Sequence, residues 1–134
     1  MIFIDSNIPM YLVGALHPHK TDSQMLLERL IARGERLATD AEVLQEIVHR
    51  YTAIGKREAI DAAMQAILMV VDEVFAIEKR DALRAAEIVK SPSMISSRDA
   101  IHIAIMERYR SSSILSFDAD FDRWPGLKRI HRID

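Results

Sequence analysis

Acidic residues follow two short apolar segments of this sequence, at the points where the segments end. Asp5 comes directly after residues 2–4, and Asp118 comes directly after residues 113–117. Both segments have the composition of buried strands, and ligands of an open parallel sheet bind at the carboxyl ends of its strands. Aspartate is also common in turns that leave strands, so a structural role stays open. The arrangement predicts that Asp5 and Asp118 meet at one edge of a sheet.

A third carboxylate, that of Asp99, belongs to a segment that is otherwise apolar almost all round. Asp99 falls between Ile103 and Met106 on the wheel of a helix predicted over residues 96–110. A carboxylate in that setting must be paired, hydrogen-bonded, neutralised or bound to a metal ion. Ser96, three residues earlier, offers a structural alternative, a capping box at the helix start. Both roles can hold at once, and we favour a functional one.

Two glutamates lie in the helix predicted over residues 39–54, and only one of them suits a functional site. Thr39 and Glu42 have the spacing of a capping box, which gives Glu42 a structural role. Glu46 lies ~60° around the helix from Val43, at the edge of the apolar stripe. From this edge a side chain can reach the rim of the sheet, so Glu46 is the better site residue.

The loop after residue 117 holds two further acids, Asp120 and Asp122. A turn or a helix start at this point could direct either side chain inward, and an acidic solvated loop is the structural alternative. Asp118 remains the first choice of the three because it leaves its strand as Asp5 leaves the first strand, and Asp122 is the second choice.

Several carboxylates at one edge of a sheet repel one another unless cations neutralise them. Oxygen ligands favour hard ions such as Mg²⁺ or Mn²⁺ over zinc. Two such ions suit phosphodiester cleavage, because one activates water and both stabilise the attacking and leaving oxygens. We therefore predict a metal-dependent nuclease. The predicted metal ligands are Asp5, Asp99 and Asp118, with Glu46, Asp120 and Asp122 as further choices.

Short apolar runs alternate with longer segments of helical period, which is typical of βαβ units on a parallel sheet. The predicted strands cover residues 2–4, 36–39, 74–77, 113–117 and 128–133. The predicted helices are a short one after residues 6–7 and the segments 19–33, 39–54, 56–71, 81–90 and 96–110, with a turn or short helix at 118–123. We expect one α/β domain over residues 1–134, with a central parallel sheet of four to five short strands.

Composition excludes several classes of protein and of site. The formal net charge is −2, so a nucleic acid would have to bind a local basic patch. Cysteine is absent, which excludes disulfides, thiolate zinc sites and cysteine nucleophiles. An acid at position 5 argues against a signal peptide, and the longest apolar run, residues 66–71, is far shorter than the ~20 residues that span a membrane. We expect a soluble, cytoplasmic protein without a membrane partner.

Four segments of the chain, in this order and spacing, resemble the PIN-domain nucleases. The segments are residues 2–7 (IFIDSN), 43–47 (VLQEI), 99–104 (DAIHIA) and 116–121 (SFDADF). The resemblance spans nearly the whole chain. Its size and single-domain layout further resemble the VapC toxins of prokaryotic toxin–antitoxin pairs.

The resemblance implies an α/β/α sandwich and an endoribonuclease that depends on Mg²⁺ or Mn²⁺. Members of the family cut tRNA, rRNA or mRNA and are inhibited by a cognate VapB antitoxin. The carry-over to this chain gives an acidic catalytic quartet: Asp5, Glu46, Asp99 and Asp118. Ser6 and Asn7 match residues beside the first aspartate of the family motif, which implies a substrate-binding role for them.

Several other features carry weaker expectations. Arg98 adjoins Asp99 and is the cation that we expect to approach RNA, although ordinary surface charge would explain it equally well. His102 could contact Asp99, but we interpret it as a partly buried structural histidine. The apolar residues of segment 56–71 are expected in the core, with dimerisation as the lesser alternative, and we predict a homodimer.

Two alternative functions stay open. Asp5 followed by Ser6 and Asn7 is similar to the start of haloacid-dehalogenase-like phosphatases, in which the aspartate is a nucleophile. That motif usually has a second aspartate where this chain has Asn7. The other alternative is a binding module that keeps the PIN fold without its chemistry.

Overall fold

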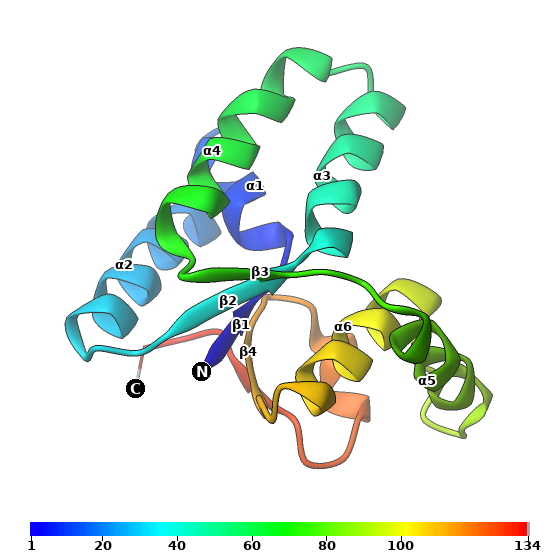
Figure 1. Ribbon diagram of the computed structural model, residues 1–134. Coiled ribbons are helices and arrows are strands. Elements are labelled where there is room, and N and C mark those ends of the chain that lie inside the picture. The colour runs from blue at the N-terminus through cyan, green and yellow to red at the C-terminus, as the bar shows by residue number, and fades with distance from the viewer. Residues whose placement is uncertain (134) are drawn as a thin grey trace.

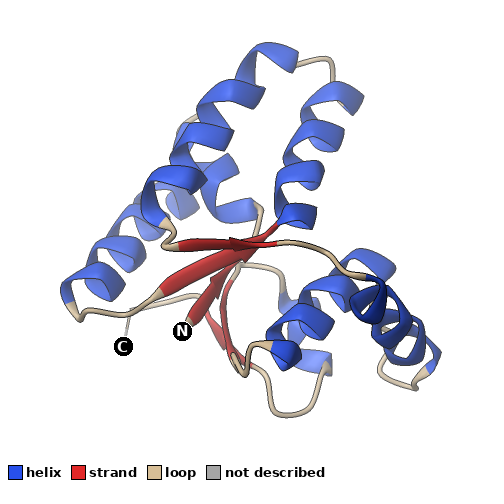
Figure 2. Ribbon diagram, viewed as in Figure 1, coloured by secondary structure: helices blue, strands red, loops and turns tan. Residues whose placement is uncertain are grey.

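Five short parallel strands form the centre of the computed structural model, which describes residues 1–133 (Figures 1 and 2). The strands are β1 (Ile2–Ile4), β2 (Leu37–Asp40), β3 (Glu73–Phe75), β4 (Ser113–Leu115) and β5 (Lys128–Ile130). Their order across the sheet is β3-β2-β1-β4-β5, and every neighbouring pair is parallel. The predicted α/β fold with four to five strands is confirmed.

Helices cover both faces of this sheet, as Figure 1 shows. The helices α1 (Asn7–Val13), α2 (Pro18–Ala32), α3 (Ala41–Ala53) and α4 (Ile60–Val70) lie on one side, and α5 (Lys79–Lys90) and α6 (Ser97–Arg108) lie on the other. Two short 3₁₀ helices, Arg57–Ala59 and Ala119–Arg123, complete the elements of the described residues. No helix in this part of the chain is both long and apolar enough to cross a membrane.

The first strand occupies the middle of the sheet because its side chains are apolar on both faces. Phe3 and Ile4 are almost completely buried, and they pack in one core with Ile8 of α1, Ile47 of α3 and Ile103 of α6. From β1 the chain moves outward to β2 and β3, and then returns to place β4 on the other side of β1. The order therefore reverses between β1 and β4, and ligands bind at such a switch point, beyond the carboxyl ends of the strands.

The start of α3 differs from the prediction by one residue, and the difference changes two roles. Asp40, not Thr39, caps the helix, because its side chain accepts a hydrogen bond from the Val43 amide at 2.9 Å. Thr39 is buried in β2, where its hydroxyl donates to the Ile4 carbonyl oxygen at 2.8 Å. The capping box predicted for Thr39 and Glu42 is therefore wrong. The Thr39 hydroxyl is used in the hydrogen bond from β2 to β1 and does not cap the helix.

Candidate metal centre

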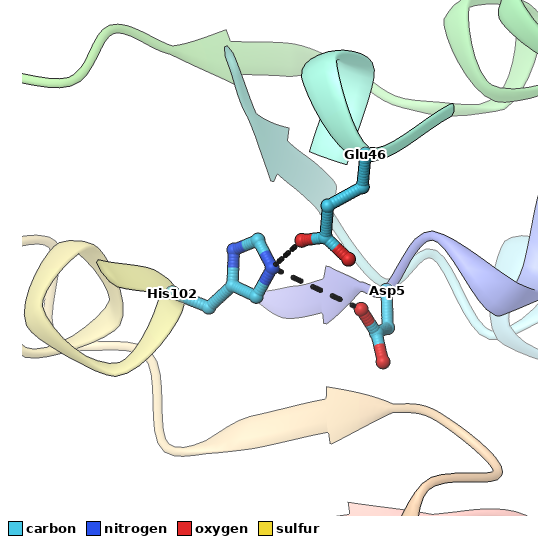
Figure 3. Close-up of side chains that lie close together, drawn as sticks. All are labelled: Asp5, Glu46 and His102. Atoms are coloured by element: carbon cyan, nitrogen blue, oxygen red, sulfur yellow. Dashed lines mark hydrogen bonds and ion pairs between the residues drawn. The ribbon is translucent and has the colours of Figure 1, made fainter. Parts of the chain in front are cut away.

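Three side chains meet beyond the carboxyl end of β1, each from a different element (Figure 3). Asp5 leaves β1, Glu46 comes from α3 and His102 comes from α6. The His102 Nε2 atom hydrogen-bonds the Glu46 carboxylate and lies 4.0 Å from Asp5 Oδ1. One potential ligand atom from each residue falls within 4.8 Å of the others.

Asp5 is buried and is held by donors on both carboxylate oxygens. The Ser6 amide donates to Oδ1 at 2.8 Å, and the Ser116 hydroxyl donates to Oδ2 at 2.6 Å. The Asn7 side-chain amide donates to Oδ2 at 3.2 Å. Burial raises the pKa of Asp5, and the charge of His102 and the hydrogen bond from Ser116 offset this only in part. The site therefore pre-orients a carboxylate that lacks a full counter-charge.

Glu46 is fixed in the same way by two neighbours. The Ser6 hydroxyl donates to Oε2 at 2.9 Å, while His102 binds Oε1. Burial alone would raise the pKa of Glu46, but the hydrogen bond and charge of His102 outweigh burial, and the pKa falls below its usual range. Glu46 is therefore ionised at neutral pH.

His102 is completely buried and bridges two acids. Its Nδ1 atom lies 2.7 Å from Asp40 Oδ2, and its Nε2 atom binds Glu46. Burial would lower the pKa of His102, but the charges and hydrogen bonds of Asp40 and Glu46 hold it well above its usual range. Both ring nitrogens of a protonated imidazole are donors, so His102 orients Glu46 and is not itself a metal ligand.

A second acidic group lies beside the first and joins α6 to the loop after β4. It consists of Asp99, Asp118 and Asp120, which also offer ligand atoms within 4.8 Å of one another. Burial and then the charges of Asp5 and Asp118 raise the pKa of Asp99 to about 7. Asp99 thus belongs to the second group, but its carboxylate is repelled by one carboxylate in each group, Asp5 in the first and Asp118 in the second.

The structure separates the three loop aspartates. Asp118 and Asp120 belong to the acidic group, although exposed Asp120 also contacts Arg123 at 3.2 Å. Asp122 points elsewhere, because both of its oxygens accept hydrogen bonds from Arg129, at 2.9 and 3.0 Å. Asp122 is therefore in neither acidic group.

Most of these acids face one cleft of about 820 Å³. Glu46, Asp99, Asp118 and Asp120 line it, while Asp5 lies buried behind them. Three cations also line the cleft: Arg50, Lys56 and Arg98. Arg98 is the cation expected beside Asp99, whereas nothing in the sequence pattern points to Arg50 or Lys56.

The donor set fits hard divalent cations. Up to five carboxylates supply oxygen ligands, and Asp99 and Asp118 have no ion pair with a lysine or arginine among those found in the described residues. Burial, followed by the charges of Asp5 and Asp118, raises the pKa of Asp99, so a nearby positive charge would stabilise its ionised form. A divalent cation would supply that charge, and oxygen donors favour Mg²⁺ or Mn²⁺.

Replacing His102 by alanine is expected to reduce both stability and metal affinity. The change removes the charge partner of the buried Asp40 carboxylate, which keeps only the hydrogen bond from the Val43 amide, and this loss costs about 3–5 kcal/mol of unfolding free energy. It also frees Glu46, and the loss of an outer partner weakens metal binding by about 10–100-fold. Urea unfolding and metal titration would measure the two effects. In the matched control, His49→Ala on the exposed side of α3, stability should change by less than about 0.5 kcal/mol. Equal stability of the two variants would contradict the bridging role.

The chain is similar in sequence to a known family and to named relatives. Residues 2–127 match the PIN domain family. Ribonuclease VapC13 of Mycobacterium tuberculosis is 56% identical over 130 residues, which are 97% of this chain and 99% of the relative. Ribonuclease VapC23 of the same organism is 30% identical over 118 residues, 88% of this chain and 93% of the relative.

Solved structures show the same fold. VapC20 of Mycobacterium tuberculosis, described as a Sarcin-Ricin loop cleaving toxin, superposes with a TM-score of 0.73 at 24% identity and covers 91% of this chain and 93% of its own. VapBC2 from Rickettsia felis, bound to a DNA fragment from its promoter, gives a TM-score of 0.74 at 18% identity over 97% and 98% of the two chains. With the family match over nearly its whole length, the chain belongs to the PIN-domain family and, within it, to the VapC ribonucleases.

Proposed function

We propose that this protein is an endoribonuclease that depends on Mg²⁺ or Mn²⁺, and that it is the toxin of a toxin–antitoxin pair. The observation that carries the proposal is the convergence of Asp5, Glu46, Asp99 and Asp118 at one cleft. Its relatives are named ribonucleases, and their names supply the substrate class, RNA.

In this proposal, the carboxylates of Asp5, Asp99 and Asp118 hold the metal ions, and Glu46 and Asp120 are further ligands. When bound, such ions activate water and stabilise the charge on the phosphodiester oxygens. Ser6 and Asn7 are both occupied within the site, since they donate to Glu46 and Asp5. We therefore propose that Ser6 and Asn7 position the carboxylates and do not contact RNA.

The cations of the cleft suit the backbone of the substrate. Arg98 stands beside Asp99 at the start of α6, and Arg50 and Lys56 line another part of the cleft. Phosphates on either side of the cleaved bond would bind these three side chains, while the carboxylates and their metal ions face the cleaved bond itself. The arrangement orients RNA by its backbone and leaves base selection to other groups.

A VapB-like antitoxin, a homodimer and a cytoplasmic location belong to the same proposal. Solved structures of similar fold include a VapBC pair, which supports an antitoxin partner. Exposed apolar side chains on α4 and β3, namely Leu68, Met69 and Val74, offer a surface for association. A toxin that cleaves RNA would act where RNA is translated. Light scattering of the purified chain would measure its oligomeric state.

The phosphatase alternative loses its chemical basis in the structure. Asn7 donates hydrogen bonds to Asp5 and Ser116, and an amide cannot act as the acid that the second aspartate of that motif provides. Membership of the PIN-domain family also argues against it. The binding module without catalysis differs from the proposed function in one result, since it would leave RNA intact in either metal.

Metal-dependent cleavage is the test of the proposed function. Protein freed of antitoxin is expected to cut total RNA in Mg²⁺ or Mn²⁺, to stop in EDTA and to resume when the metal is restored. The cut RNA ends, mapped by sequencing, would identify the target. RNA that stays intact in either metal would contradict the proposal and favour the binding module.

A further inference from the structure

Four aromatic rings form a cluster at one end of the acidic cleft. The ring of Tyr11 lies 4.9 Å from that of His17, 5.1 Å from that of His19 and 5.5 Å from that of Phe117, measured between centroids. His19 and Phe117 stack in parallel at 3.9 Å. These contacts join α1, the start of α2 with its cap residue, and the loop that follows β4.

The cluster is joined directly to the proposed catalytic site. Phe117 immediately precedes Asp118, and Tyr11 and His17 line the same cleft as Asp99 and Asp118. His17 is exposed, and Tyr11 is half-buried. Leu16, on the same rim, has 97% of its surface exposed. Apolar and aromatic surface therefore borders the cleft within reach of the carboxylates.

The ring of His17 is held in place by a backbone hydrogen bond. Its Nδ1 atom accepts from the His19 amide at 3.0 Å and so caps α2. Tyr11 is supported from behind by the edge contact with Phe117. Rings that are ordered before binding lose little entropy when they bind a flat ligand.

From this geometry we propose that Tyr11 and His17 form a stacking platform for an unpaired base of the RNA, next to the cleaved phosphodiester. Bases of single-stranded RNA stack on aromatic side chains, and cations bind the phosphates between them. The cleft combines both elements, since Arg50, Lys56 and Arg98 line it with the two rings. A base inside a duplex has no free face, so the platform selects single-stranded loops.

The inference rests on the proposed ribonuclease function, and its test separates the two. Asp5→Asn provides a background without cleavage, in which affinity is measured for a short single-stranded oligouridylate carrying one 2-aminopurine. Stacking of this base lowers its fluorescence. Tyr11→Leu keeps apolar bulk but removes the ring, and His17→Asn removes the ring but keeps a good helix cap. Tyr11→Phe restores the ring and serves as the matched rescue.

We expect Tyr11→Leu and His17→Asn each to weaken binding about tenfold and to diminish the quenching of 2-aminopurine, and Tyr11→Phe to restore both. In both ring variants the affinity for RNA should depend on salt concentration as it does in the Asp5→Asn parent, because neither substitution removes a phosphate contact. Arg98→Gln should instead reduce the salt dependence. A duplex of the same sequence should bind the parent and the ring variants equally.

Three results would overturn the platform. The first is unchanged affinity and quenching in both ring variants. The second is a loss of binding that Tyr11→Phe does not restore. The third is unchanged RNA binding with reduced affinity for the antitoxin, which would make the cluster a protein-docking surface. If the wild-type protein cuts RNA while one of these results is obtained, the platform fails and the ribonuclease function stands.

Discussion

Cleavage of RNA by this protein is expected to fall at least about a thousandfold when Asp5 is replaced by asparagine. Asp5 is the buried carboxylate of the site, and the loss of its charge removes a metal ligand worth several kcal/mol in the transition state. The side chain keeps its shape, and Oδ1 can still accept the hydrogen bond from the Ser6 amide. Single-turnover cleavage of total RNA, compared at equal concentrations of folded protein, would measure the effect.

Asp122→Asn is the matched control for this prediction. The substitution is the same, but Asp122 is exposed and paired with Arg129 outside both acidic groups. An exposed ion pair contributes at most about 1 kcal/mol to stability, so activity should stay near that of the wild type. Comparable activity of Asp5→Asn and wild-type protein would point to a contaminating nuclease and remove Asp5 from the site.

Metal affinity is expected to be about tenfold weaker at pH 6 than at pH 8. The pKa of Asp99 is raised to about 7 in the metal-free protein, so at pH 6 a proton must leave this carboxyl before a metal ion can bind. Mn²⁺ titrations at the two pH values would give the ratio. In Asp99→Asn, Mn²⁺ should bind weakly at both pH values, and the ratio of the two affinities should be smaller than in the wild type.

The same carboxyl has an effect on stability that runs opposite to ordinary acid denaturation. A pKa that is higher in the folded than in the unfolded protein means that folding favours the protonated acid. The stability contributed by Asp99 is therefore present below about pH 4 and is lost as the pH rises to about 7. In EDTA, Asp99→Asn should gain stability over the wild type at pH 8 but not at pH 4. Equal gains at both values would contradict the raised pKa.

The acids of the site could be predicted from the sequence where simple geometry applied. Asp5 and Asp118 follow apolar strands, and the ends of neighbouring parallel strands must lie together. Asp99 is conspicuous in the sequence because a carboxylate on an apolar helix must be paired or bound, and Glu46 is chosen by its angle to the apolar stripe. The fold class is confirmed for similar reasons, since alternation of strands and helices has few solutions.

Contacts between distant segments could not be predicted in this way. Asp40 meets His102 from 62 positions away, and the periodicity of neither segment contains that information. A signal is nevertheless present, because Asp40 is the last residue of β2 and Asp5 directly follows β1. The difference between Asp120 and Asp122 depends on Arg129, which lies on β5 and binds only Asp122 of the two. Long-range pairing of this kind depends on packing and not on local pattern.

The pairing of β1 with β4 also determines when the acidic site can assemble during synthesis. The first strand made pairs with β4, and Asp5 receives its shortest hydrogen bond from Ser116. A nascent chain therefore holds Asp5 without its partner strand until residues 113–118 have left the ribosome. Asp5 and Ser116 are 111 positions apart, so at ~5–20 residues per second the acidic site stays unassembled for roughly 6–22 seconds after Asp5 is made.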